Sequence, residues 1–269
     1  MENAIVVPCY NEAERLDLPS FEKFLNQNSN YTICFVNDGS SDNTLDVLKS
    51  FQAHCPDRVH VYDAPRNNGK AEAIRAGVNF MLRNSTAKNI GFMDADLATG
   101  FDDYENLVDS LDYHIDTDGM VIGSRTRVNT SNIQRTPFRS ASSNIFNVII
   151  QWILGVKIND TQCGAKVFKR NTANTLFKKA FISKWLFDIE LLMRMRNKHG
   201  KQSMLNKLEE VTLRKWTEVE GSKITFKDAI KFPIQLFKIA FNYNFKPVLD
   251  NKPSIFLYRT VKNIKSFLF

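Results

Sequence analysis

The chain has 269 residues, of which 43% are hydrophobic and 24% are charged. This composition is that of an ordinary globular protein, and it excludes disordered and fibrous classes. The formal net charge of +7 at pH 7 indicates an anionic partner, which could be nucleic acid, an acidic membrane surface or a phosphorylated substrate.

The first hundred residues alternate short apolar runs with longer amphipathic segments. Runs rich in β-branched residues predict strands at 4–7, 31–36, 59–62 and 89–93. Apolar residues at helical spacing predict helices after Asp42 and from Lys70. A strand followed by a helix, repeated along the chain, predicts an α/β fold with a mostly parallel sheet flanked by helices.

Polar residues follow each of these four strands directly. They are Cys9-Tyr10-Asn11-Glu12, Asn37-Asp38-Gly39-Ser40-Ser41-Asp42, Ala64-Pro65-Arg66-Asn67-Asn68-Gly69-Lys70 and Asp94-Ala95-Asp96. Ligands of parallel sheets bind at the carboxyl ends of the strands, so we expect these segments to converge on one polar cleft. The second segment is typical of a tight turn at Gly39, with Ser41 or Asp42 as the N-cap of the next helix. Capping does not account for Asp38 at the strand tip.

Asp94 and Asp96 stand two residues apart at the end of a strand, where alternation aims both side chains to the same side. Such a pair suits a hard divalent cation, Mg²⁺ or Mn²⁺, with substrate phosphates supplying the remaining ligands. The cation would neutralise a departing diphosphate. An isolated triplet of this kind is more often a solvated acidic turn, but the polar segments around this one favour the cation site.

A fifth strand is predicted at 119–123, and Arg125 follows it closely. A basic loop with Arg127, Arg135 and Arg139 comes next. An apolar helix is predicted from Ser142 onward. From Phe226 onward, phenylalanine and isoleucine recur on one helical face and lysine on another, which predicts C-terminal amphipathic helices. We therefore divide the chain into a main domain at 1–225 and an amphipathic basic segment at 226–269.

Four segments resemble, in order and spacing, the signatures of the family 2 inverting glycosyltransferases. They are Pro8-Cys9-Tyr10-Asn11-Glu12, Val36-Asn37-Asp38-Gly39-Ser40-Ser41-Asp42, Asn67-Asn68-Gly69-Lys70 and Met93-Asp94-Ala95-Asp96. The resemblance covers residues 4 to about 225. It implies the GT-A type fold of nucleotide-diphospho-sugar transferases.

The second half resembles the polyprenyl-phosphate hexose synthases of that family, and among them the dolichyl-phosphate glucosyltransferases. The matching segments are Gly123-Ser124-Arg125, Arg139-Ser140 with Ser143 and Asn147, Asp160-Thr161-Gln162-Cys163-Gly164-Ala165-Lys166, Trp185-Leu186-Phe187-Asp188-Ile189-Glu190 and Trp216-Thr217-Glu218-Val219-Glu220-Gly221-Ser222-Lys223. Ala98 stands where mannose synthases tend to place a further polar ligand, which favours the glucosyl group. Ala165 stands where an aromatic residue is common.

The resemblance also implies roles for the matching residues. The nucleotide-sugar donor would be bound by Pro8, Tyr10, Glu12, Asp38, Lys70 and Asp94, with Asp38 at the base and Asp94 at the ribose or the metal. Asp94 and Asp96 would hold Mg²⁺ or Mn²⁺. The acceptor phosphate or the donor diphosphate would be met by Arg125, Arg139, Ser143 and Lys223, since phosphate calls for arginine forks and a lysine charge.

Asp160 joins Asp96 and Arg125 in the expected catalytic region, although it is not assigned as a base. A phosphomonoester acceptor has a second pKa near 6 and is already largely ionised at neutral pH, so it needs no strong base. Asp160 would instead orient the sugar or pair with an arginine or lysine. For Asp188 and Glu190, contacts with sugar hydroxyls and a structural ion pair are equally expected.

The resulting hypothesis is a metal-dependent inverting transfer of a hexose, glucose from UDP-glucose, to polyprenyl or dolichyl phosphate. Two alternatives stay open. One is a glycosyltransferase that acts on a glycan or another soluble hydroxyl in cell-surface polysaccharide synthesis. The other is a noncatalytic protein that binds a nucleotide sugar. Nucleic acid is not expected as a partner, because no RRM, KH or zinc-finger pattern occurs.

Location is the last inference from the sequence. No N-terminal targeting signal and no apolar run of membrane-spanning length is recognised. The four cysteines lack paired spacing, which suits buried thiols in a reducing compartment. For the apolar helix around 145–156, membrane contact and plain core packing are equally expected. The amphipathic helix near 226–241 suits an anionic interface, and the basic tail at 255–269 favours peripheral contact with the cytoplasmic face of a membrane.

Overall fold

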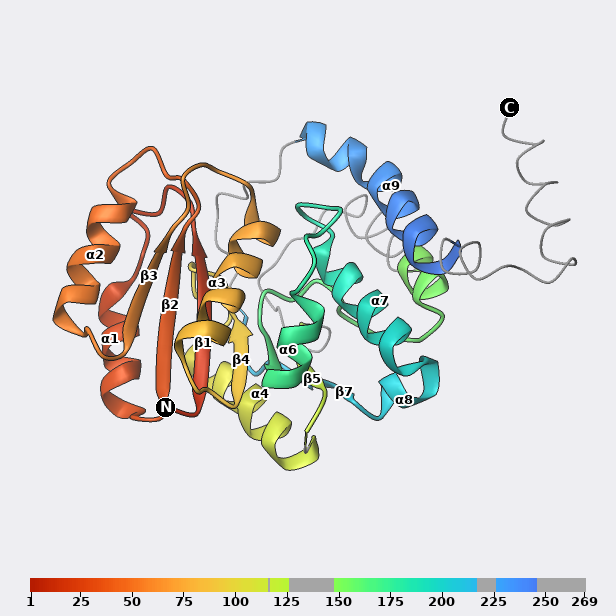
Figure 1. Cartoon of the computed structure of the whole chain (residues 1–269), viewed down its shortest axis with the longest axis horizontal. Helices are drawn as coiled ribbons and strands as arrows, with labels where there is room; N and C mark the ends of the chain where they lie inside the picture. Colours follow the sequence, from red (N-terminus) through yellow and green to blue (C-terminus); the bar gives the residue numbers. More distant parts are fainter. Residues whose placement is uncertain (116, 126–147, 217–225, 246–269) are drawn as a thin grey trace, which may run out of the picture. The chain divides into compact units, whose positions relative to one another are not determined.

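Seven strands form one sheet in the order β3-β2-β1-β4-β6-β5-β7 within the part of the chain that the computed structural model describes, residues 1–115, 117–125, 148–216 and 226–245 (Figure 1). The strands are β1 (Asn3–Cys9), β2 (Tyr31–Asn37), β3 (Val59–Asp63), β4 (Asn89–Phe92), β5 (Met120–Ser124), β6 (Lys166–Lys169) and β7 (Leu208–Thr212). The first five lie where the sequence predicts them, within two residues at each end.

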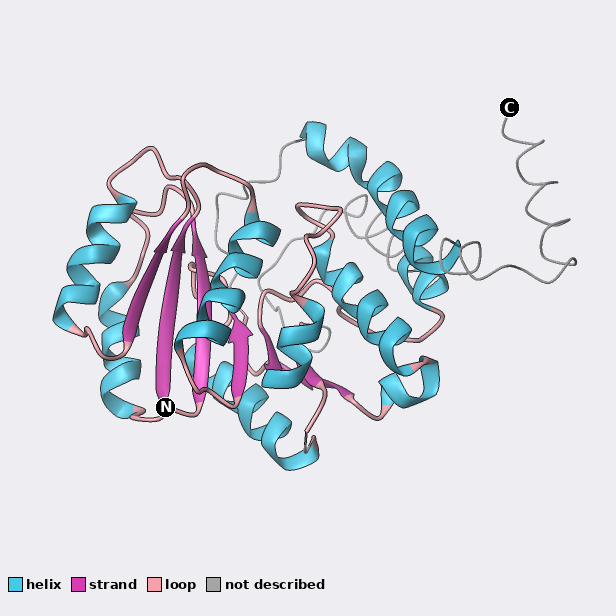
Figure 2. Cartoon of the chain, viewed as in Figure 1, coloured by secondary structure: helices cyan, strands magenta, loops and turns pink. Residues whose placement is uncertain are grey.

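Helices cover both faces of this sheet, as Figure 2 shows in cyan around the magenta strands. In the unit that holds the sheet, the helices are α1 (Leu18–Gln27), α2 (Thr44–His54), α3 (Lys70–Asn84), α4 (Phe101–His114), α6 (Arg170–Leu176), α7 (Phe187–His199) and α8 (Lys201–Leu205). The C-terminal unit contains α9 (Phe226–Ala240), which continues into the π-helix η1 (Phe241–Phe245). Residues 148–154 are also helical, and they are the described part of the apolar helix predicted from Ser142. The helices predicted after Asp42 and from Lys70 are confirmed as α2 and α3.

One strand runs against its neighbours. β1 pairs in parallel with β2 and β4, β2 with β3, and β5 with β7, whereas β6 is antiparallel between β4 and β5. A reversed strand presents its beginning at the edge where parallel strands present their ends. The residues before β6 therefore reach the same edge of the sheet as the polar segments after β1 to β5.

Both faces of the sheet are packed. Ile5 and Val7 of β1 belong to a buried cluster with Phe21 of α1. The intervening Val6 points to the opposite face, as strand alternation requires, and a Cβ added at Gly77 of α3 would lie 2.4 Å from Val6 Cγ1. Glycine thus lets α3 approach the sheet closely. Burial on both faces gives the loops at the carboxyl edge a firm support.

The start of α2 differs from the prediction. The helix begins at Thr44 with Asn43 at the N-cap, and no side chain caps it by a hydrogen bond. Asp42 Oδ1 instead accepts the Thr44 N–H at 3.0 Å and the Thr44 hydroxyl at 2.5 Å. The expectation that Ser41 or Asp42 would be the N-cap is therefore wrong. The Asp42 carboxylate reaches the N–H two residues on in an Asx turn, so the helix starts after it.

The chain forms two compact units, Met1–Ile224 and Thr225–Phe269. The sheet belongs to the first unit and α9 to the second. Among the described residues, no helix combines the length and the apolar content that crossing a bilayer requires. α9 and η1 expose the large apolar side chains of Ile234, Phe237 and Phe241.

Candidate active site

Hydrogen bonds join the loop after β1 to the loop after β2. Asn11 takes a left-handed conformation with φ of 51°, and its Oδ1 accepts the Ser41 N–H at 2.9 Å. The Asn11 N–H donates to Ser40 Oγ at 3.0 Å, and the Glu12 N–H donates to Thr44 Oγ1 at 2.8 Å. Asparagine tolerates positive φ better than most residues. The two loops therefore form one wall of the site, with Glu12 fixed in it.

Asp38 is buried at the tip of β2 and holds the loop that follows β3. Its Oδ1 accepts the Asn68 N–H at 2.9 Å, and its Oδ2 accepts the Gly69 N–H at 2.8 Å. Burial raises the pKa of Asp38 although these two hydrogen bonds oppose the shift. Each carboxylate oxygen has a second lone pair, so the contact with a nucleotide base stays a prediction. Asp38 has the further role of shaping the entry to α3.

The turn beside Asp38 requires glycine. Gly39 has φ of 62°, and a Cβ there would lie 2.4 Å from the backbone carbonyl carbon of Arg66. Any larger residue would push the loops after β2 and β3 apart. The tight turn that the sequence predicts at Gly39 is thus confirmed, with a reason that involves a second loop.

Three segments of the chain meet at Asp94, after β4. The Lys70 ammonium at the start of α3 lies 2.5 Å from Asp94 Oδ1. Burial lowers the pKa of Lys70, but the charge and hydrogen bond of Asp94 outweigh it, so the pKa is raised overall. On the other side, a Cβ at Gly164 would lie 2.1 Å from Asp94 Oδ2. Gly164 precedes β6, so the reversed strand brings it here.

Asp96 is held by a short turn of its own. Its Oδ1 accepts the Ala98 N–H at 3.0 Å, and Leu97 between them has φ of 53°. Burial raises the pKa of Asp96, and the charge of Asp94 raises it further, while the Ala98 hydrogen bond opposes both. Neighbouring carboxylates disfavour each other's ionisation, and a divalent cation would relieve that repulsion.

The carboxylate oxygens of Asp94 and Asp96 fit a divalent metal ion that binds together with a diphosphate. Among the described residues, no three His, Cys, Asp or Glu side chains are arranged to hold a metal ion. Magnesium sites of nucleotide enzymes commonly use one or two carboxylates and complete the shell with phosphate oxygens and water. Asp94 and Asp96 supply that number of carboxylates.

Arg125 and Asp160 form a close ion pair across the site. Arg125 Nε donates to Asp160 Oδ2 at 2.6 Å, a terminal guanidinium nitrogen donates to Oδ1 at 2.9 Å, and the Arg125 N–H donates to Oδ2 at 3.0 Å. Glu210 of β7 accepts the Asp160 N–H at 3.0 Å. This is the pairing with an arginine that the sequence analysis weighed for Asp160.

The pair makes Asp160 a poor general base. Burial would raise the pKa of Asp160, but the hydrogen bonds and charge of Arg125 outweigh it, so the pKa lies below its usual value. An effective base has a pKa near the working pH and a lone pair aimed at the proton it removes. The Asp160 carboxylate is ionised at neutral pH, and both its oxygens already accept hydrogen bonds from Arg125.

A buried lysine lies behind the site. The Lys166 ammonium of β6 is fully buried and lies 2.7 Å from Asp188 Oδ1 and 2.7 Å from the Cys163 carbonyl oxygen. Burial raises the pKa of Asp188, against the opposing charge of Lys166. Glu190 Oε1 accepts the Ser183 N–H at 2.8 Å. Of the two readings left open for Asp188 and Glu190, the described contacts are those of a structural role.

The residues predicted from the sequence share one electrostatic environment. Glu12 acts on the pKa of Asp96, and Asp188 acts on the pKa values of Lys70 and Arg125. Pro8 and Tyr10 lie at the end of β1 and just beyond it, and Tyr10 is exposed. Three further predicted residues lie outside the described part of the chain, namely Arg139, Ser143 and Lys223.

Two lysines of the site received no role from the sequence. Lys166 ends the motif that begins at Asp160, and only the structure places Asp188 beside it. Lys184 packs on Gly69, where an added Cβ would lie 3.1 Å from Lys184 Cδ, and its charge acts on the pKa of Asp38. The sequence feature that could have pointed to Lys184 as a site residue is its position directly before the motif that begins at Trp185.

Gly164 offers a test of how tightly Asp94 is placed. Gly164→Ala is expected to lower kcat/KM about 100-fold, because the new methyl group would displace the Asp94 carboxylate and misplacement of a reacting group by about 1 Å costs roughly that factor. Steady-state kinetics on the purified variant measure it. Gly100→Ala is the matched control, since nothing lies within 4 Å of a Cβ there. Equal activities of the two variants would contradict the close contact.

Comparison with known proteins gives consistent relatives. The family model described as Glycosyl transferase family 2 matches residues 4–183. A Drosophila melanogaster dolichyl-phosphate beta-glucosyltransferase is 35% identical over 90% of this chain and 76% of its own length. The Mus musculus protein of that name is 37% identical over 82% of this chain and 69% of its own. The Saccharomyces cerevisiae one is 32% identical over 93% and 77%.

The fold is also found among solved structures. Glucosyl-3-phosphoglycerate synthase from Mycobacterium tuberculosis, crystallised with Mn²⁺, uridine diphosphate and glucosyl-3-phosphoglycerate, matches with a TM-score of 0.64 at 15% identity, over 90% of this chain and 79% of that one. The same enzyme with uridine diphosphate alone gives a TM-score of 0.61 at 14% identity. The GT-A type fold predicted from the sequence is thereby confirmed.

Proposed function

The chain belongs to glycosyltransferase family 2, and from this premise we propose that it transfers glucose from UDP-glucose to dolichyl phosphate with inversion at the anomeric carbon. The observation that carries the proposal is the agreement of the relatives. Proteins from insect, mouse and yeast, 32–37% identical over 82–93% of this chain, share the name dolichyl-phosphate beta-glucosyltransferase. Inversion converts the α-linkage of the donor into a β-linked product.

The site of this chain suits a phosphate acceptor. A phosphomonoester with a second pKa near 6 carries its own nucleophilic oxygen at neutral pH. No base is then needed, and Asp160, held ionised by Arg125, is free of that task. The acceptor oxygen attacks C1 of glucose in line with the departing uridine diphosphate. An alcohol acceptor would need a group with a higher pKa to take its proton.

We infer that Asp94 and Asp96 hold Mg²⁺ or Mn²⁺ together with the donor diphosphate. The bound ion supplies neutralisation of the charge that develops on the leaving uridine diphosphate. Lys70 orients the Asp94 carboxylate through its 2.5 Å contact. Asp38 fixes the backbone of Asn68 and Gly69, and so positions Lys70 at the donor. Arg139, Ser143 and Lys223 complete the proposal as ligands of the acceptor phosphate or the diphosphate.

The proposal is tested by release of uridine diphosphate from UDP-glucose with Mn²⁺, with and without dolichyl phosphate. Release that depends on the lipid, with formation of dolichyl phosphate glucose, is the expected result. GDP-mannose in place of UDP-glucose is the control for the donor. Equal release with a soluble sugar acceptor in place of the lipid would instead support the glycan-directed alternative, and tight binding of uridine diphosphate without any release would support a noncatalytic protein.

We also infer that α9 contacts the cytoplasmic face of the membrane that holds the lipid acceptor. Ile234, Phe237 and Phe241 are 60%, 64% and 43% exposed at spacings of three and four, and Lys231 and Lys238 are exposed among them. Apolar side chains flanked by lysines suit the headgroup region of an anionic bilayer. Flotation with vesicles containing phosphatidylserine measures the contact. Flotation of Ile234→Ser/Phe237→Ser equal to that of the unmodified protein would refute it.

A further inference from the structure

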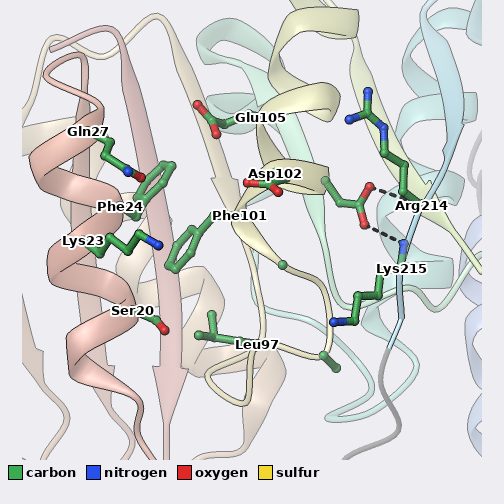
Figure 3. Close-up of a pocket in the computed structure, with 13 residues that line it drawn as sticks. Ser20, Lys23, Phe24, Gln27, Leu97, Phe101, Asp102, Glu105, Arg214 and Lys215 are labelled. Atoms are coloured by element: carbon green, nitrogen blue, oxygen red, sulfur yellow. Dashed lines mark hydrogen bonds between the residues drawn. The ribbon is translucent and has the colours of Figure 1, made fainter.

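Asp103 fixes the segment that follows β7. It lies in the first turn of α4 and is 4% exposed. Its Oδ1 accepts the Arg214 N–H at 2.9 Å and its Oδ2 accepts the Lys215 N–H at 3.1 Å, the two hydrogen bonds drawn as dashed lines in Figure 3. Hydrogen bonds from backbone N–H groups to a buried carboxylate are charge-assisted and strong. One aspartate thus sets the position of two successive peptide groups.

A cavity beside the segment makes the position of its backbone more dependent on the hydrogen bonds to Asp103. About 390 Å³ of space lies between α1 and this segment, lined among others by Lys23, Phe24 and Phe101, as Figure 3 shows. The Arg214 and Lys215 side chains border this space and are exposed. On that side the backbone of the segment has no close-packed support, so its position depends on the bonds to Asp103.

The next residue joins the same segment to the loop of the paired carboxylates. Trp216 forms an isolated antiparallel bridge with Thr99, which is 5% exposed. Thr99 lies three positions after Asp96 in the chain, and Asp103 lies seven positions after Asp96. Both attachments of the segment therefore come from the short stretch of chain that leads away from Asp96.

Trp216 also reaches the other half of the site. The Arg125 guanidinium lies 5.6 Å from the centre of the Trp216 ring, within the range of a cation–π contact. Arg125 in turn holds Asp160 by two side-chain hydrogen bonds. A continuous series of contacts thus runs from the loop after Asp96, through Trp216, to Arg125 and Asp160.

We propose that Asp103 and Trp216 are positioning residues of the transfer reaction, which set Arg125 and Asp160 at a fixed distance from Asp94 and Asp96. We call Thr99, Asp103 and Trp216 the clasp. The inference rests on the proposed function, since the clasp joins the carboxylates proposed to hold the metal and the donor diphosphate to Arg125, which is expected at the acceptor phosphate or the donor diphosphate. Its physical basis is that transfer between two bound substrates depends steeply on their mutual alignment, whereas binding of either one alone does not.

Asp103→Asn is the first test. The amide offers one acceptor oxygen where the carboxylate offers two, and its NH₂ group would face a backbone N–H. We expect kcat with dolichyl phosphate to fall about 10- to 100-fold, while the Kd for uridine diphosphate with Mn²⁺, measured by calorimetry, stays within about twofold. Asp102→Asn, on the adjacent exposed residue, is the matched control and should leave both quantities unchanged.

Amide hydrogen exchange gives a readout that does not depend on turnover. At least one of the Arg214 and Lys215 amides should exchange faster in Asp103→Asn than in the unmodified protein, because the single amide oxygen replaces only one of the two acceptors. Faster exchange with unchanged kcat would overturn the positioning role. A parallel loss of nucleotide affinity would do so too, because it would indicate general damage to the fold. If the unmodified protein binds nucleotide but transfers nothing, the proposed function has failed and the exchange result still tests the Asp103 contact.

Substitutions of Trp216 test the second half of the clasp. Trp216→Phe keeps an aromatic face for Arg125, whereas Trp216→Leu keeps apolar bulk without one. We expect Trp216→Leu to lose at least tenfold in kcat, and Trp216→Phe to remain within about threefold of the unmodified protein. Equal kcat values for the two variants would show that the aromatic face does not position Arg125.

Discussion

Asp96→Asn is expected to reduce transfer about 1000-fold and to remove its dependence on added Mn²⁺ or Mg²⁺. The amide is almost isosteric with the carboxylate, so the Ala98 N–H keeps its acceptor and the turn is preserved. What is lost is the negative charge that binds the cation. Removal of one preorganised electrostatic contact at a leaving group costs roughly 100- to 1000-fold in rate, and a weakly bound cation adds to that loss.

The measurement is the initial rate of uridine diphosphate release over a range of Mn²⁺ concentrations, together with the thermal midpoint of each protein. Asp102→Asn is the control, since it makes the same chemical change on an exposed residue six positions further along. Mn²⁺-stimulated activity of Asp96→Asn at the level of that control would remove Asp96 from the proposed metal site. A chelator should reduce the unmodified enzyme to the level of Asp96→Asn.

Lys166→Met is expected to lower the free energy of unfolding by about 3–5 kcal/mol, the range for breaking one side of a buried ion pair. Lys166 is fully buried, and its ammonium lies 2.7 Å from Oδ1 of the Asp188 carboxylate. Without it, Asp188 must either stay charged in the interior or take up a proton. Burial already raises the pKa of Asp188, so protonation would limit the loss. Urea unfolding followed by circular dichroism measures the change.

Two further variants separate the charge from the packing. Lys169→Met is the matched control on the same strand, because the Lys169 ammonium pairs with Asp112, whose side chain is 51% exposed; it should cost under about 1 kcal/mol. Lys166→Met/Asp188→Leu should recover much of the loss, since apolar replacements of a whole buried pair are often tolerated. A double variant as unstable as Lys166→Met would argue against an unpaired Asp188 as the cause.

Local patterns were sufficient for the first half of the fold. β1, β2 and β4 are buried along almost their whole length, and β3 carries Val59 and Val61, so apolar composition marks all four strands, and the polar segments after them follow from the rule for parallel sheets. Asp94 and Asp96 were likewise visible because their spacing is local. β6 and β7 were not predicted. β6 has four residues, two of them lysines, and the β7 segment Leu-Glu-Glu-Val-Thr is largely polar.

The contacts that could not be predicted join distant parts of the chain. Lys166 and Asp188 are 22 positions apart, and Arg125 and Asp160 are 35 positions apart. The local periodicity of apolar residues does not indicate which charged residues will form an ion pair, because that depends on the order of the strands in the sheet. The sequence analysis accordingly left the role of Asp160 and of Asp188 open, and the reversed direction of β6 is the fact that places both.

The Arg125–Asp160 pair also bears on how such an enzyme can change its acceptor. The pair closes the base of the stretch from 126 to 159, whose two ends are thereby fixed to the sheet by β5 on one side and by the residues before β6 on the other. A relative with another sequence between these two ends can therefore keep the same strand register and the same paired carboxylates. Grafting the corresponding stretch from a relative with another acceptor is the matching route for engineering.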